Sequence, residues 1–316
     1  MSALAASHPT LLDLAKRLDP DGKIDVIAEI LTQENPILED MNFVEGNLPT
    51  GHRTTIRTGL PTPTWRKLYG GVQPTKSTTA QVTDSCGMLE AYAEADKALA
   101  DLNGNTAAFR LSEDRAHIEG MAQELASTII YGNEGDQPEA FTGLAPRYNS
   151  LSAANADNIV SAGGTGSDNT SIWLVVWGDQ TLHGIYPKGS RAGLDMRDKG
   201  QVTIENVDGS GGRMEAYRTH YRHDCGLTVR DWRFAARVCN IDVSALTSDG
   251  TAADRAAAQK ALINFMVQAS ERIPSLSKGR AVWYVNRTIR EQLRLVIIEK
   301  IAGNLAWETE TGKRVI

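Results

Sequence analysis

The sequence predicts an α+β fold, in which helices and a mostly antiparallel sheet occupy separate parts of the chain. Three observations predict it. Residues 112–131 carry apolar side chains at helical spacing, and several segments within residues 172–241 alternate apolar and polar side chains. Residues 252–301 contain two further helical patterns around a short apolar strand. Such separation of strands from helices is typical of the α+β class.

The composition is that of a soluble globular chain. Of 316 residues, 41% are hydrophobic and 23% charged, and a chain this long buries a sizeable core without disulfides. The net charge of -6 argues against a surface that coats nucleic acid, which needs a basic stripe. Three unpaired cysteines indicate a reducing site of synthesis. No signal peptide and no membrane-spanning apolar run is found, so we expect no membrane contact.

The first structured elements are expected in residues 10–31. Two short amphipathic helices are predicted there, separated by a turn at residues 19–22. Two interpretations stay open. The pair docks on the core of its own subunit, or it forms an arm whose apolar face needs a neighbouring subunit.

Residues 43–95 predict a long hairpin. They are rich in Thr, Gly and Pro, and Pro61, Pro63 and Pro74 exclude a helix but suit the edges and tip of a hairpin. Gly70 and Gly71 mark the bend. A hairpin with so few apolar residues does not stabilise itself in water. It therefore lies on something else, for which an adjacent subunit is the natural candidate; the alternative is a mobile surface loop.

The hairpin also supplies the candidate functional residues. All of its charged residues between positions 53 and 76 are basic, and a tryptophan stands beside an arginine at its tip, a pairing common among interface anchors. The predicted inter-subunit residues are Arg53, Arg57, Trp65, Arg66, Lys67 and Lys76. Their acidic partners on a neighbour are expected among Glu113, Asp114, Glu34, Glu39 and Asp40.

Helices are expected next. Residues 90–102 have a helical appearance, and residues 112–131 form the clearest helix of the chain, capped by Ser112 and ended by Gly132. The predicted strands follow: Ile172–Trp177, Gln201–Asn206, Met214–His223 and Leu227–Ile241. We expect four tryptophans of predicted strands to pack in the core: Trp173, Trp177, Trp232 and Trp283. The C-terminal part is predicted to contain a helix at 252–273, a strand at 281–285 and a last helix from Asn286 to Gly303.

No catalytic, cofactor or metal site is predicted. His220, His223 and Cys225 are the densest polar cluster, but on a strand His220 would face away from the other two, and zinc needs three or four ligands on one side. The glycines at 163–166 lack the Lys-Ser or Lys-Thr pair of a phosphate loop, and the chain has no Gly-x-Ser-x-Gly elbow. We therefore expect a protein that is not an enzyme.

The ordered set of parts resembles the major capsid proteins of tailed bacteriophages with the Hong Kong 97-like fold. The resemblance is carried by TTIRTGLPTPTWRKLYGGVQPTKSTT, by EAYAEADKALADLNGN and by GLTVRDWRFAARVCNID, and it extends over nearly the whole chain. It implies an N-terminal arm at 1–42, an extended E-loop hairpin at 43–95, a peripheral domain with a spine helix at 96–250, and an axial domain at 251–316.

The resemblance also implies a function. The chain would assemble into hexamers and pentamers of an icosahedral head that encloses double-stranded DNA, with a portal and a scaffolding or decoration protein as further partners. It would be made in the cytoplasm of a bacterial host and reside in the virion. Two alternatives remain: an encapsulin-like nanocompartment shell, and, with less support, a mixed α and β hydrolase or sugar-binding enzyme, which would need a pocket with convergent polar groups.

Overall fold

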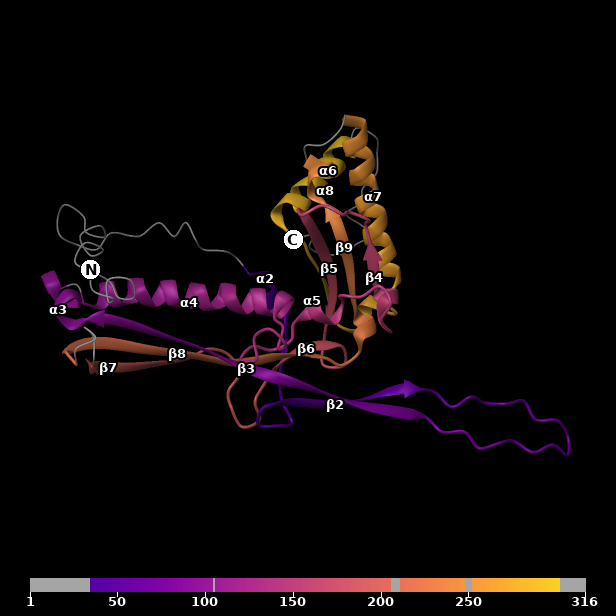
Figure 1. Ribbon diagram of the computed structural model, residues 1–316, viewed down its shortest axis with the longest axis horizontal. Coiled ribbons are helices and arrows are strands. Elements are labelled where there is room, and N and C mark those ends of the chain that lie inside the picture. Colours follow the sequence, from indigo (N-terminus) through magenta and orange to yellow (C-terminus); the bar gives the residue numbers. More distant parts are fainter. Residues whose placement is uncertain (1–34, 105, 206–210, 248–251, 302–316) are drawn as a thin grey trace.

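The computed structural model describes residues 35–104, 106–205, 211–247 and 252–301. Figure 1 shows two packed bodies and a long hairpin that extends away from both. Ten strands form one continuous sheet within the described part of the chain, and the sheet passes from the hairpin through the first body into the second. The predicted helices at 10–31 and the chain beyond residue 301 lie outside the described residues.

The first body is a long helix that lies along three antiparallel strands (Figure 1). Its central strand pairs with the two others along most of its length and continues to a fourth strand at the junction of the bodies. The elements of this body and of the hairpin are α2 (Pro36–Asp40), β1 (Phe43–Glu45), β2 (Gly51–Gly59), β3 (Thr78–Asp96), α3 (Lys97–Ala100), η2 (Leu102–Gly104), α4 (Thr106–Tyr131), α5 (Leu144–Arg147), β6 (Leu182–Tyr186), β7 (Asp195–Glu205) and β8 (Arg213–Val229).

The prediction of a helix at 90–102 is wrong, because most of this segment belongs to strand β3. Cys86 to Asp96 pair with Gly226 to Ala216 of β8, and helix appears only from Lys97 to Ala100. Alanine and glutamate favour helices in isolation, but that preference is weak and tertiary pairing overrides it. The burial has the two-residue period of a strand, since Ala93 and Ala95 are buried between more exposed neighbours.

The predicted helix over residues 112–131 is confirmed as one continuous element, α4, but α4 begins earlier, at Thr106. Ser112 therefore lies inside the helix. Phe109 is fully buried and extends the apolar stripe by a turn towards the N-terminus, together with Met121, Leu125 and Ile129. The 26 residues make a rod of about 39 Å at 1.5 Å per residue.

The second body packs three helices against a small sheet (Figure 1). Its central strand is flanked by antiparallel neighbours on both sides, and the main hydrophobic core lies between this sheet and the helices. Its elements are η3 (Ala156–Asn158), β4 (Ile159–Ser161), β5 (Asn169–Trp177), η4 (Trp232–Phe234), β9 (Ala235–Asp242), α6 (Val243–Thr247), α7 (Ala252–Glu271), η5 (Leu276–Lys278), β10 (Arg280–Tyr284) and α8 (Arg287–Ile301).

The strand predicted over Leu227–Ile241 is wrong as a single element. Strand β8 ends at Val229, a 3-10 turn follows, and β9 begins at Ala235. Asp231 caps that turn by accepting a hydrogen bond from the backbone N–H of Arg233 at 3.1 Å. The break lets the chain leave the first body and enter the second. An Asp whose side chain accepts a hydrogen bond from the backbone N–H two residues later favours a turn, and this local preference competes with strand formation.

The C-terminal helix–strand–helix order is confirmed by α7, β10 and α8. Asn286 caps α8 as predicted, because its Oδ1 accepts the backbone N–H of Ile289 at 2.8 Å. Of the four tryptophans expected in the core, Trp173 and Trp177 are buried, whereas Trp283 is half-buried. Trp232 lies in the 3-10 turn and is also only half-buried, so its placement in a strand is wrong. No described helix is long and apolar enough to cross a membrane.

Candidate assembly interface

The hairpin arm, defined here as residues 51–83, is built on an antiparallel pair. Strand β2 pairs with β3 from Gly51 opposite Ser85 to Gly59 opposite Thr78. Residues 60–77 continue beyond the last pair without regular strand structure. A turn closes the tip, where the backbone N–H of Gly70 donates to the carbonyl of Lys67 at 3.0 Å and Tyr69 adopts a left-handed φ of 61°. Threonine-rich extended chain interrupted by proline explains why pairing stops before the tip.

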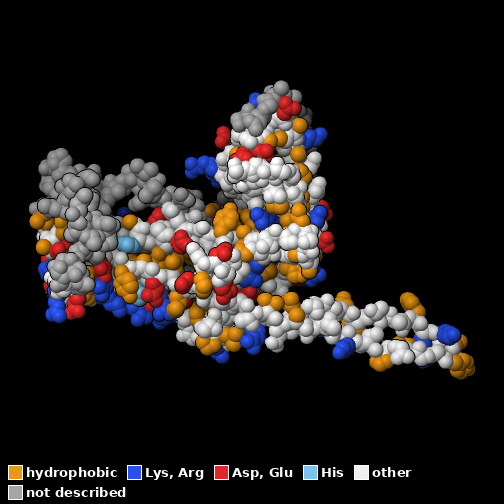
Figure 2. Space-filling view, viewed as in Figure 1, with side chains coloured by type: hydrophobic (Ala, Val, Ile, Leu, Met, Phe, Trp, Pro, Cys, Tyr) orange, Lys and Arg blue, Asp and Glu red, His pale blue; other side chains and the backbone are white. Residues whose placement is uncertain are grey.

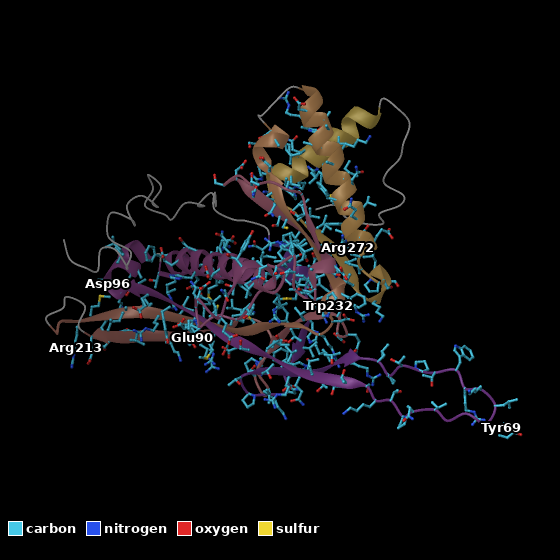
Figure 3. The ribbon with its side chains drawn as sticks, turned by 45° about the vertical axis from the view of Figure 1, so that its right-hand side comes forward. Tyr69, Glu90, Asp96, Arg213, Trp232 and Arg272 are labelled. Atoms are coloured by element: carbon cyan, nitrogen blue, oxygen red, sulfur yellow. The ribbon has the colours of Figure 1, made fainter. Side chains whose placement is uncertain are left out.

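The tip exposes large apolar side chains. Leu60, Leu68 and Val72 are exposed, and Trp65 and Tyr69 both have a relative exposure of 105%. Figure 3 shows Tyr69 at the end of the hairpin farthest from the rest of the molecule. An isolated subunit gains nothing by holding an indole and a phenol in water, and exposed apolar side chains gathered in one segment are typical of interaction sites.

The predicted basic residues are placed along the arm without partners of opposite charge. The Arg53 Nε donates to Thr83 Oγ1 at 3.2 Å, and Asn47 hydrogen-bonds both the N–H and the carbonyl of Arg53. Within the described chain, no ion pair involves any predicted basic residue of the arm: Arg53, Arg57, Arg66, Lys67 and Lys76. All five are exposed. The structure thus brings the predicted residues onto one projecting element.

The root of the arm is fixed by a buried ion pair that sequence reasoning missed. Arg147 Nη1 lies 2.8 Å from Asp84 Oδ1, and the Asp84 side chain is only 3% exposed. Arg147 also donates to the carbonyls of Thr142 and Leu227. A guanidinium that meets a carboxylate and two carbonyls satisfies its fork of donors. The contact holds the base of the hairpin against α5 and β8, so the arm projects from a fixed point.

Two histidines pack beside that root. The rings of His52 and His183 lie 6.0 Å apart in an edge-to-face arrangement, and His183 is buried. Burial lowers the pKa of each histidine, and the positive charge of Arg230 contributes to both shifts. His52 lowers the pKa of His183 further. Both shifts favour the neutral form of the rings.

A second set of contacts fastens α2 to the second body. Trp177 Nε1 donates to the hydroxyl of Tyr284 at 2.7 Å, and this hydroxyl donates to Asp40 Oδ2 at 3.1 Å. Arg280 forms an ion pair with the other oxygen of Asp40. Asp40, which was expected among the acidic partners for a neighbouring hairpin, is instead buried and paired within its own subunit. The distance of 240 residues between the partners explains why sequence inspection missed the pair.

The polar cluster on β8 is arranged as strand alternation requires. His220 Nε2 lies 3.2 Å from Glu90 Oε2, and its ring stacks on Tyr92 with centroids 4.5 Å apart. His223 packs edge-to-face on Phe43, and burial raises the pKa of the Cys225 thiol to about 12. A metal needs a deprotonated thiolate. The described residues contain no group of three potential metal ligands.

This geometry defines a class of protein: a subunit of two packed bodies joined by one sheet, with a long exposed hairpin that projects from them. The family model described as Major capsid protein GP7 matches residues 19–316, and the chain belongs to this family. A chain in the near-atomic structure of bacteriophage epsilon15 is 41% identical, with a TM-score of 0.75; the match covers 100% of this chain and 93% of that one. The protein is a major capsid protein of a tailed phage, with the Hong Kong 97-like fold, and it forms an icosahedral head.

Other solved structures are more distant. An encapsulin of Synechococcus elongatus is 13% identical with a TM-score of 0.48, over 72% of this chain and 93% of that chain. A chain of the native GTA particle capsid is 12% identical with a TM-score of 0.48, over 76% and 98%. No curated protein matches the sequence. The expected capsid role is confirmed, and the encapsulin alternative has only this distant likeness.

Proposed function

We propose that the hairpin arm is the main contact between neighbouring subunits of the capsid lattice. Arg53, Arg57, Trp65, Arg66, Lys67 and Lys76 are its contact residues. One observation carries the proposal: the tip is fully exposed on its own subunit, although it contains large apolar side chains. Burial of an indole and a phenol on a neighbour removes apolar surface from water. The free energy gained is about 25 cal/mol per Å² of that surface, and it offsets the entropy lost when the arm is ordered.

We also propose that the chain is divided into the four regions of a Hong Kong 97-like capsid subunit. An N-terminal arm occupies 1–42, the E-loop hairpin region 43–95, the peripheral domain 96–250 and the axial domain 251–316. The long helix α4 supports the peripheral assignment, and the packing of α7 and α8 on one small sheet supports the axial one. That sheet also draws β4, β5 and β9 from within residues 96–250.

Further partners follow from the capsid role. The head encloses double-stranded DNA, one vertex holds a portal, and a scaffolding or decoration protein assists assembly. Synthesis takes place in the cytoplasm of a bacterial host, and the subunit needs no cofactor and catalyses no reaction. The net charge of -6 supports a capsid shell that encloses DNA without binding it tightly.

Reversal of charge at the tip tests the arm. The variant R66E/K67E is expected to fold normally, because both side chains are exposed and form no ion pair with any described residue, but to assemble into particles poorly. The physical reason is that a basic arm orients subunits against an acidic surface, and reversed charges oppose that encounter. Particle yield by sedimentation, with far-UV dichroism as the test of folding, measures the effect.

A matched control is available on the body. Lys188 and Arg191 are also exposed and take part in no ion pair among the described residues, so K188E/R191E changes the net charge equally. We expect this variant to assemble like the wild type. Normal particle yield from R66E/K67E would show that the arm's charges are merely solvated.

A further inference from the structure

A groove opens on the first body near the root of the hairpin. Its walls come from β3, β8, the C-terminal half of α4 and the segment 137–141. The lining includes Leu89, Leu125, Phe141 and Cys225, all of which belong to the main hydrophobic core or pack against it. The groove thus reaches the edge of the core from outside. An apolar recess of this kind accepts a large apolar side chain.

The rim of the groove is acidic. Glu124 of α4 and Glu139 line it and are exposed, and within the described chain neither takes part in an ion pair. No lysine or arginine occurs between residues 116 and 146, whereas five carboxylates do: Glu119, Glu124, Glu134, Asp136 and Glu139. Figure 2 shows acidic side chains on the middle of the body, above the start of the hairpin.

The hairpin tip has the complementary properties. It presents Trp65 with Arg66 and Lys67 directly after it, and no acidic residue occurs between positions 46 and 83. Figure 2 shows basic and apolar side chains towards the end of the arm. Tryptophan and arginine are the residues most enriched at the energetic centres of interfaces. An apolar recess with an acidic rim therefore matches an apolar knob with basic neighbours.

The occupant of the groove is a second copy of this chain. The arm extends away from its own body, so the tip does not reach the groove of its own subunit (Figure 1). From the buried Asp84 to Tyr69 the chain spans up to about 50 Å at roughly 3.3 Å per residue, which exceeds the length of α4 and suffices to cross a neighbour. A contact between two different patches of identical subunits is head-to-tail, and such contacts form a ring when the rotation between subunits closes.

We propose that Trp65 of one subunit inserts into the groove lined by Leu125 and Phe141 of the next, while Arg66 and Lys67 meet Glu124 and Glu139 on its rim. The inference rests on the proposed role of the hairpin arm and adds its docking surface. It names Glu124 and Glu139 as the acidic partners in place of Glu113, Asp114, Glu34, Glu39 and Asp40. Of these, Asp40 is buried in an ion pair of its own.

Charge exchange between the two patches tests the pairing. E124K/E139K is expected to lower particle yield by about tenfold, as R66E/K67E does, because like charges then face each other. The quadruple variant, in which both patches are reversed, is expected to regain assembly to within about threefold of wild type, since opposite charges face again. Failure of the quadruple variant to recover, with each double variant folded, would overturn the pairing.

Disulfide trapping tests proximity independently of charge. Thr64 precedes Trp65 in the chain and Gln137 lines the groove, and both are exposed. In assembled particles T64C/Q137C should form disulfide-linked ladders of subunits on non-reducing gels, because a disulfide requires Cα atoms within about 7 Å. Because the free thiol of Cys225 lines the groove and Cys86 precedes its lining residue Gly87, all variants carry C86A/C225A. In that background, T64C alone and T64C paired with V267C, on the exposed face of α7, are the controls.

The outcomes separate the two levels of the proposal. If R66E/K67E assembles normally, the role of the arm itself is wrong. If R66E/K67E fails to assemble but E124K/E139K assembles normally and T64C/Q137C gives no ladder, the arm docks elsewhere and only the groove assignment is wrong. Ladders from T64C/Q137C together with recovery by the quadruple variant support both.

Discussion

His183 shows how single residues restrain the base of the hairpin. It is buried on β6, and its ring faces His52 of β2. A neutral imidazole tolerates such a site, whereas an imidazolium would carry an unsatisfied charge in the interior. Burial accordingly lowers the pKa of His183, and the nearby His52 and Arg230 lower it further.

Acid sensitivity follows from this site. Above the ordinary histidine value of 6.5, His183 is neutral in folded and unfolded chains, so it adds no pH dependence. As the pH falls below 6.5, the unfolded chain binds a proton that the folded chain resists, and the free energy of unfolding decreases. We expect H183Q to show a smaller loss of stability between neutral and mildly acid pH than the wild type. Urea unfolding of unassembled subunits across that range measures it, and parallel curves for the two proteins would contradict the prediction.

At the scale of an element, helix α4 combines a buried stripe with a weak point. Gly120 lies in its interior, exposed, and a Cβ added there would meet nothing within 4 Å. Glycine costs about 0.5–1 kcal/mol relative to alanine inside a helix, since it loses more backbone freedom on folding. The end of the same helix is different, because a Cβ on Gly132 would lie 2.5 Å from the carbonyl oxygen of Phe141.

These two glycines give opposite predictions. G120A is expected to raise the free energy of unfolding by about 0.5–1 kcal/mol. G132A is expected to lower it by about 1–3 kcal/mol, because the backbone has to shift to admit the methyl group. Denaturant unfolding of the two variants provides the comparison. A loss of stability in G120A would mean that the exposed face of α4 contacts something within the subunit.

Strand β3 carries two roles in one element. Its first residues, from Thr78, pair with β2 in the arm, and its last, up to Asp96, pair with β8 under the long helix. Near the end of the stretch that pairs with β2 lies the buried Asp84, which forms an ion pair with Arg147. One strand therefore connects the hairpin arm to the sheet of the first body through continuous backbone pairing.

At the scale of the whole molecule, basic and acidic residues lie on different parts of the subunit, although its net charge is only -6. The arm is purely basic and the body carries the excess of acid, so each copy supplies both signs for its neighbours. Such an arrangement steers encounter and orientation more than it adds affinity. It also keeps like-charged arms apart in a concentrated solution of free subunits.

Salt should therefore slow assembly. Exposed charges are screened over about 8–10 Å at physiological ionic strength and over about 3 Å at 1 M, so the rate should fall steadily between about 0.05 M and about 0.5 M salt. Light scattering follows the rate. The neutral variant R66Q/K67Q should be slower at low salt and should depend less on salt, whereas W65A should keep the salt dependence of the wild type. An equal salt dependence in R66Q/K67Q would place the steering charges elsewhere.

The sequence by itself determined the elements whose signal is local. The periodic stripe of α4, the cap at Asn286 and the prolines of the arm each act over a few residues, and each predicted element exists. The basic side chains of the arm and Trp65 were predicted as interface residues for the same reason, since composition and turn chemistry are read from neighbours in the chain.

Only the tertiary structure decided what depends on partners far away in sequence. Ala93 and Ala95 lie in a strand because β8 pairs with them across more than a hundred residues, which overrides their helical preference. Asp40 is unavailable to a neighbour because Arg280 and Tyr284 hold it. The groove beside Glu124 and Glu139 exists only where β3, β8 and α4 meet. The free energy of such contacts depends on chain segments brought together by folding, and no local pattern records that meeting.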